Sequence, residues 1–94
     1  MIYIVTYDIE DDKIRSKLSK VLKGVGQRVQ KSVFECELSK RQLKILQKQI
    51  GRMLPKSGED SNVRIYPLCV KCHKKASGVG RVTQSIYSKH YIVI

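Results

Sequence analysis

The chain has 94 residues, and its 19 lysines and arginines outnumber eight acidic residues to give a formal net charge of +11. This length suits one small domain with a modest core, and no stretch is apolar enough to span a membrane. No signal peptide is visible, so we expect a cytoplasmic protein without a membrane partner, whose three cysteines are reduced thiols. The excess of cations indicates a polyanionic partner, most often a nucleic acid, although a solvated basic surface is the alternative.

Residues 2–8 are predicted to form a strand with two apolar faces. Ile2 and Ile4 point to one side of it, while Tyr3, Val5 and Tyr7 point to the other. A strand that is apolar on both sides is covered on both sides, so we expect helices on one face and a second copy of the protein on the other.

Asp8 ends this strand and is an unusual residue at such a position. Spacing alone favours a role as the cap of the helix that follows. The alternative is a metal site, in which a two-fold dimer brings two Asp8 carboxylates together around Mg²⁺, an ion that binds through one or two carboxylates plus water.

The next elements are predicted in chain order: a helix over 11–23, extended chain over 28–38 that is long enough for two short strands, a helix over 39–54, and a strand over 63–68. Asp11 and Asp12 suit the start of the first helix. Ser39 and Gln42 form a capping box at the start of the second. Pro67 cannot donate a ladder hydrogen bond, so the last strand belongs at a sheet edge or a strand end.

This order, β-α-β-β-α-β, predicts an α+β ferredoxin-like fold with both helices on one face of an antiparallel sheet. We expect a single domain over residues 1–94, with a core over 1–68 and a basic loop over 69–85. We also expect residues 86–94 to form an additional apolar C-terminal strand that packs on the partner of a homodimer.

Several polar side chains are candidates for binding a phosphate backbone: Arg15, Lys17, Arg28, Gln30 and Lys31. The cysteines form a separate group. Cys69 and Cys72 have C-x-x-C spacing and precede His73, so a zinc site is conceivable only if the fold brings Cys36 to them. Reduced thiols are the favoured interpretation.

Taken together, several motifs resemble those of one family, and they occur in order with the proper spacing from residue 1 to about 68: Tyr7-Asp8-Ile9, Asp11-Asp12, Arg15, Leu18, Leu22, Gly26, Arg28-Val29-Gln30, Ser32-Val33-Phe34-Glu35 and Val63-Arg64-Ile65-Tyr66-Pro67-Leu68. The family is CRISPR-associated protein two, a small universal CRISPR adaptation protein also described as the CRISPR-associated endoribonuclease. The resemblance implies a ferredoxin-like homodimer in which the two Asp8 residues face one shared Mg²⁺ ion.

The resemblance also implies an activity and a set of roles. The expected activity is a metal-dependent endonuclease for single-stranded RNA, and in some members for double-stranded DNA, within a complex with CRISPR integrase dimers that acquires new spacers. Tyr7, Asp8, Arg15 and Arg28 are the expected catalytic residues, and Asp8 is the expected metal ligand. Residues expected to bind nucleic acid are Lys17, Gln30, Lys31 and Phe34, with Lys17 standing where some relatives have arginine.

Three alternatives to this enzyme share the same topology. One is a non-catalytic, DNA-binding structural dimer that spaces two integrase dimers. The second is a toxin-type ribonuclease of the same fold. The third is an RNA-recognition module, which is disfavoured because Phe34 is a lone aromatic residue where that module places several.

Overall fold

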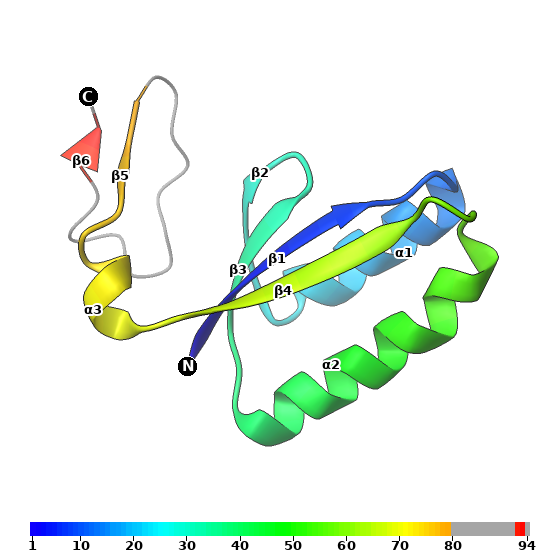
Figure 1. Ribbon diagram of the computed structural model, residues 1–94, viewed down its shortest axis with the longest axis horizontal. Helices are drawn as coiled ribbons and strands as arrows, with labels where there is room; N and C mark the ends of the chain where they lie inside the picture. Colours follow the sequence, from blue (N-terminus) through cyan, green and yellow to red (C-terminus); the bar gives the residue numbers. More distant parts are fainter. Residues whose placement is uncertain (80–91, 94) are drawn as a thin grey trace.

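The computed structural model describes residues 1–79 together with the backbone of residues 92 and 93. Its elements, shown in Figure 1, are β1 (Ile2–Asp8), α1 (Asp12–Lys23), β2 (Gly26–Gln30), β3 (Val33–Glu37), α2 (Lys40–Met53), a 3-10 turn (Leu54–Lys56), β4 (Asn62–Leu68), α3 (Val70–His73), β5 (Ser77–Gly78) and β6 (Ile92–Val93). The predicted β-α-β-β-α-β order is confirmed.

Strands β1 to β4 form one antiparallel sheet in the order β2-β3-β1-β4. Helices α1 and α2 lie side by side on the same face of this sheet (Figure 1). Strand β4 is at an edge, as Pro67 predicts, because the residue that lacks an amide hydrogen needs no partner on that side. The fold is therefore the α+β ferredoxin-like arrangement that the sequence indicates.

The helix starts follow the local sequence. The Asp11 carboxylate accepts a hydrogen bond of 2.9 Å from the Ile14 amide and caps α1. Ser39 and Gln42 make both hydrogen bonds of the predicted capping box at the start of α2. The interpretation of Asp8 as a helix cap is wrong, because Asp8 is the last residue of β1 and Asp11 already occupies the cap position.

The core lies between the sheet and the two helices. Side chains at alternate positions of β1 and β3 face the helices and are almost fully buried: Tyr3, Val5, Tyr7, Phe34 and Cys36. They pack with apolar residues of α1 and α2, among them Leu18, Leu22, Leu46 and Ile50. We call this side of the sheet the covered face, and the side that carries Ile4, Thr6 and Asp8 the open face.

The segment after β4 differs from the prediction. The expected loop over 69–85 contains α3 and β5 within its described part. The reason is local: Cys69 has an extended backbone and its Sγ accepts a hydrogen bond of 3.2 Å from the Cys72 amide, which starts a helical turn. His73 of this turn is buried with its Nε2 at 3.4 Å from Glu35 Oε2 on the open face, so α3 covers one end of that face.

The expected C-terminal strand over 86–94 is described only at Ile92–Val93, which pairs in parallel with Ser77–Gly78 of the same chain. Residues 86–91 and 94 lie outside the described part of the chain, and packing of this strand on a partner stays a prediction. Within the residues that the structure describes, no helix is long and apolar enough to cross a membrane.

Candidate nucleic-acid and metal-binding sites

The Asp8 carboxylate lies at the end of β1 on the open face. In the sheet register Asp8 is opposite Asn62, Thr6 is opposite Arg64, and Ile4 lies between Glu35 and Tyr66. Asp8 is exposed, and the helices are on the other side of the sheet. The structure therefore places Asp8 where a second molecule can reach it.

Most carboxylates of the chain are gathered at this end of the domain. Two loops contact each other there, since the Glu10 amide donates to Ser61 Oγ at 3.0 Å and the Asp11 amide donates to the Ser57 carbonyl at 3.2 Å. We call this region the acidic corner; it holds six of the eight acidic residues of the sequence: Asp8, Glu10, Asp11, Asp12, Glu59 and Asp60. An anionic substrate is repelled from this corner unless a cation lies between them.

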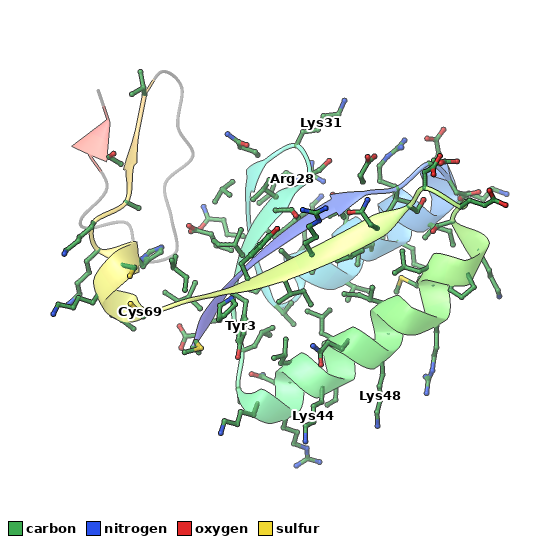
Figure 2. The ribbon with its side chains drawn as sticks, viewed as in Figure 1. Tyr3, Arg28, Lys31, Lys44, Lys48 and Cys69 are labelled. Carbon is green, nitrogen blue, oxygen red and sulfur yellow. The ribbon has the colours of Figure 1, made fainter. Side chains whose placement is uncertain are left out.

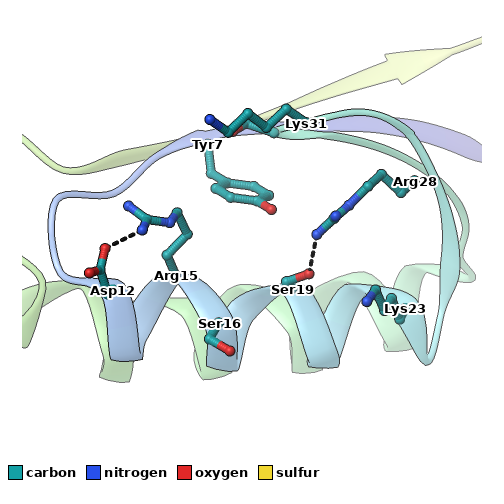
Figure 3. A pocket seen from close by; sticks show the side chains of 9 residues that line it. Tyr7, Asp12, Arg15, Ser16, Ser19, Lys23, Arg28 and Lys31 are labelled. Atoms are coloured by element: carbon teal, nitrogen blue, oxygen red, sulfur yellow. Dashed lines mark hydrogen bonds and ion pairs between the residues drawn. The ribbon is translucent and has the colours of Figure 1, made fainter.

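A pocket of about 370 Å³ lies between α1 and the β2–β3 hairpin (Figure 3). Its nine lining residues combine four cations, three serine hydroxyls, one tyrosine and one carboxylate: Arg15, Lys23, Arg28, Lys31, Ser16, Ser19, Ser32, Tyr7 and Asp12. Converging guanidinium, ammonium and hydroxyl donors are the groups that bind a phosphate. We call it the phosphate pocket, and its volume suits a nucleotide-sized group.

The two arginines of the phosphate pocket are held in place. Arg15 donates to the Ile9 carbonyl at 3.0 Å and forms an ion pair with Asp12. Arg28 donates to Ser19 Oγ at 2.6 Å, and its guanidinium carbon lies 5.4 Å from the centre of the Phe34 ring. In Figure 3 the Tyr7 ring lies between these two side chains. Both cations are therefore positioned before any ligand arrives.

The predicted site residues fall into separate groups. Tyr7, Arg15, Arg28 and Lys31 line the phosphate pocket, whereas Asp8 is on the opposite face, because neighbouring residues of a strand point to opposite sides. Lys17 and Gln30 are exposed but do not line the pocket. Within one chain, Arg15 and Arg28 are thus separated from Asp8 by the sheet.

Phe34 does not fit the predicted role of a residue that contacts nucleic acid. Its side chain is fully buried, with 0% of its surface exposed, and its ring stacks on Tyr7 at a centroid distance of 6.3 Å. A base cannot stack on a ring that solvent does not reach. The ring instead supports Arg28 from below through a cation–π contact.

Sequence reasoning missed Ser19 and Lys23 of the phosphate pocket. A signal was present, because Arg15, Ser19 and Lys23 are spaced by four residues and so lie on one side of α1. Ser19 is a buried polar residue whose hydroxyl accepts the Arg28 hydrogen bond. Only the packing of β2 against α1 shows that Arg28 is the cation that contacts this side of the helix.

The outer surfaces of the two helices carry seven further cations. Exposed cations occupy the sides of α1 and α2 that face away from the sheet: Lys13, Lys17, Lys20, Arg41, Lys44, Lys48 and Arg52. Figure 2 shows Lys44 and Lys48 projecting from α2 away from the sheet. No Asp or Glu occurs between Lys40 and Met53. We call these seven cations the basic helical layer.

The zinc site considered from the sequence is not formed. Cys36 is buried on the covered face, whereas His73 lies against Glu35 on the open face. Among the described residues, no group of three or more His, Cys, Asp or Glu side chains is placed to hold a metal ion. Cys36, Cys69 and Cys72 are free thiols, and burial, with a smaller contribution from Glu35, raises the pKa of Cys36 to about 11.

The sheet topology, the phosphate pocket and the basic helical layer define a ferredoxin-like α+β protein with a surface suited to a polyanion. The family model described as CRISPR associated protein Cas2 matches residues 1–76. The chain therefore belongs to that family, as its motifs indicate.

Individual relatives agree with this assignment. The protein named CRISPR-associated endoribonuclease Cas2 1 from Chloroflexus aurantiacus is 38% identical over an alignment of 92 residues, and the match covers 93% of this chain and 98% of that protein. The crystal structure of Streptococcus pyogenes Cas2 at pH 6.5 superimposes with a TM-score of 0.70 at 26% identity, over 81% of this chain and 95% of that chain. A chain of a structure described as a partial Cas6-RT-Cas1–Cas2 complex matches with a TM-score of 0.69 at 28% identity, over 95% of this chain and 93% of that one.

Proposed function

We propose that the protein is a CRISPR adaptation subunit with a Mg²⁺-dependent endonuclease site that cleaves single-stranded RNA and, as a second substrate, double-stranded DNA. The observation that carries the proposal is the exposed Asp8 carboxylate on the open sheet face, inside the acidic corner. The name of the Chloroflexus relative, an endoribonuclease, supports the reaction class.

The fit of Mg²⁺ to this chain requires a homodimer. One exposed carboxylate supplies half of a site, and no cluster of three ligands surrounds it in the described residues. Mg²⁺ is commonly bound by one or two carboxylates and several waters, so Asp8 of each protomer would be sufficient. When bound, the ion would supply an activated water and offset the charge of a phosphodiester.

The remaining groups of the chain would bind and orient the substrate. The phosphate pocket would hold a backbone phosphate away from the reacting bond, because Arg15 and Arg28 are on the other side of the sheet from Asp8. Tyr7 is only 6% exposed, so its side chain would lie between the pocket and the core and fix the positions of the two arginines. This division gives the predicted catalytic residues two tasks: ion binding by Asp8, and placement of substrate by Tyr7, Arg15 and Arg28.

The test is a nuclease assay of Asp8→Asn on single-stranded RNA and duplex DNA, with Mg²⁺ and with a chelator. We expect the metal-dependent rate to fall by at least about 100-fold, because the ion loses its carboxylates. Asp60→Asn removes the same charge from the acidic corner and is the matched control, which should keep the wild-type rate. Cleavage by a folded Asp8→Asn dimer with unchanged metal dependence would contradict the proposal.

A second function, DNA binding and scaffolding of integrase dimers, is favoured by the basic helical layer. Arg41, Lys44, Lys48 and Arg52 lie within 12 residues of α2, and the 11 steps from the first to the last correspond to about 16 Å along the helix axis. That length covers roughly five steps of one DNA strand at about 3.4 Å each. The relative in a Cas1–Cas2 complex supports an integrase as the protein partner.

The scaffold function is tested by replacing these four α2 cations with glutamine and measuring duplex DNA affinity against salt. If all four contact phosphates, the slope of log K against log salt should become shallower by about 3 to 4. Replacing Lys71, Lys74 and Lys75, which lie outside the layer, is the control and should change the slope far less. An unchanged slope in the α2 variant would exclude this surface, whereas retained DNA binding by Asp8→Asn would separate the scaffold from the nuclease.

A further inference from the structure

The function proposed above uses none of the cysteines, yet two of them form an exposed pair. Cys69 and Cys72 flank the start of α3, with their sulfur atoms 3.0 Å apart. Cys69 Sγ also accepts the hydrogen bond from the Cys72 amide. Both side chains are exposed, whereas Cys36 is buried in the core. We propose that Cys69 and Cys72 are a redox-active dithiol that reacts reversibly with small anionic disulfides.

The geometry suits an intrachain disulfide. The two sulfurs already lie in contact, so bond formation needs only a small shortening of their separation and rotation about the side chains. The four-residue segment carries no glycine or proline, and its helical turn holds the two cysteines on adjacent positions of one side. A pair that is pre-arranged loses little conformational entropy when the bond closes.

The chemical setting makes Cys69 the attacking group. The hydrogen bond between the two thiols lowers the pKa of Cys69, with smaller contributions from backbone amides and the charge of Lys75. The same bond raises the pKa of Cys72. Lys71, Lys74 and Lys75 lie in or next to α3, so the surroundings are electropositive and exposed, as for reactive cysteines in general. Those cations also complement the carboxylates of a disulfide such as oxidised glutathione.

The reaction balances in two steps. The Cys69 thiolate attacks one sulfur of oxidised glutathione, which forms a mixed disulfide and releases one glutathione thiolate. The Cys72 thiol then loses its proton, and its thiolate attacks Cys69 Sγ, which releases the second glutathione thiolate. The two protons of the dithiol pass to the two glutathione thiolates, and two electrons pass from the protein to the oxidant.

The disulfide would form at a structural junction. Cys69 follows the last residue of β4, and Cys72 precedes His73, whose side chain is 1% exposed and lies against Glu35 on the open face. The bond would therefore tie the start of α3 to the turn that docks on the sheet. Reduction would restore the free pair without disturbing the covered face, because the core contains neither sulfur.

The test uses the full chain, freed of metal by a chelator and incubated at fixed ratios of reduced to oxidised glutathione. Free thiols are then blocked in acid-quenched samples, and the intact mass and peptide masses are measured. We expect a species that has lost two hydrogen atoms, with the bond between Cys69 and Cys72, whose fraction follows the ratio of oxidised glutathione to the square of reduced glutathione. Cys36→Ala is the matched control and should behave like the wild type.

Two single variants test the assignment of the attacking sulfur. Cys72→Ser should accumulate the mixed disulfide on Cys69, because the second step cannot occur. Cys69→Ser should react with oxidised glutathione at least about ten times more slowly, because the backbone amide hydrogen bonds that lower the pKa are made to the sulfur at position 69 and not to Cys72. The proposal is overturned if the folded chain forms no Cys69–Cys72 bond in excess oxidised glutathione, if the bond involves Cys36, or if the two variants react at equal rates.

Discussion

The two faces of the sheet differ in how completely one chain buries them. On the covered face, Tyr3, Val5 and Tyr7 have 8%, 0% and 6% of their surface exposed, and the helices complete their packing. On the open face, Ile4 and Thr6 are half-buried, and Tyr66 remains 48% exposed. One chain thus completes one core and leaves the other surface unfinished.

This difference indicates which face of the sheet a second molecule would cover. The covered face needs no partner, and the phosphate pocket at its margin is built by a single chain. The open face combines exposed apolar surface with Asp8, which we propose as half of a metal site. A homodimer formed through the open face would bury Tyr66 and bring two Asp8 carboxylates into one groove. One interface would therefore cover the exposed apolar surface and also complete the proposed metal site.

The largest expected effect concerns the covered face. Phe34→Ala removes a fully buried ring that contacts Tyr7 and supports Arg28, and we expect a loss of about 3–5 kcal/mol in the free energy of unfolding. Tyr66→Ala removes an aromatic side chain from the open face and should cost less than about 0.5 kcal/mol in the monomer. Urea unfolding at a concentration where the chain is monomeric measures both. Equal losses would show that the two faces are packed alike.

A smaller effect is expected on association. Tyr66→Lys places a charge on the open face, and we expect the dissociation constant of the dimer to rise at least about ten-fold, equivalent to about 1.4 kcal/mol, while the fold of the monomer is kept. Ile45→Lys is the matched control, because Ile45 is similarly exposed at 51% but lies on α2. Sedimentation equilibrium gives both constants. A dimer weakened by Ile45→Lys and not by Tyr66→Lys would assign the interface to the helices.

The covered face was the more predictable of the two from the sequence. The alternation of Tyr3, Val5 and Tyr7 and the capping box of Ser39 depend on residues close together in the chain, and local rules suffice for them. The role of Asp8 could not be decided locally, because Asp8 and Asp11 both precede the helix. Only the point at which β1 ends shows that Asp11 is the cap.

The sites are less predictable than the elements because they join distant residues. Arg28 meets Ser19 only when β2 packs beside α1, and His73 meets Glu35 only when the chain after β4 returns to the open face. Phe34 was expected to contact nucleic acid. Its position in the strand predicts only the side of the sheet to which it points, and this side is buried because the helices pack on it. Motif resemblance identifies such residues without specifying the side of the sheet on which each one acts.

The smallest effect is a pH dependence that originates on the covered face. Burial raises the pKa of Cys36 to about 11 in the folded chain from an ordinary value of 9.0. Below the ordinary value both states hold the proton, so the contribution to stability is complete there; above it the unfolded chain loses its proton first, and stability falls as the pH rises towards the folded pKa. Between about pH 8 and pH 10, the free energy of unfolding should therefore fall by about 1 kcal/mol more in the wild type than in Cys36→Ala.

Urea titrations under reducing conditions at several pH values measure this difference. The other titratable groups are the same in both proteins, so their contributions cancel in the comparison. Val5→Ala is the control, because it removes volume from the same core without removing a thiol, and it should keep the pH dependence of the wild type. If the wild type and Cys36→Ala lose stability in parallel, water reaches the thiol, and the covered face is less completely closed than its packing indicates.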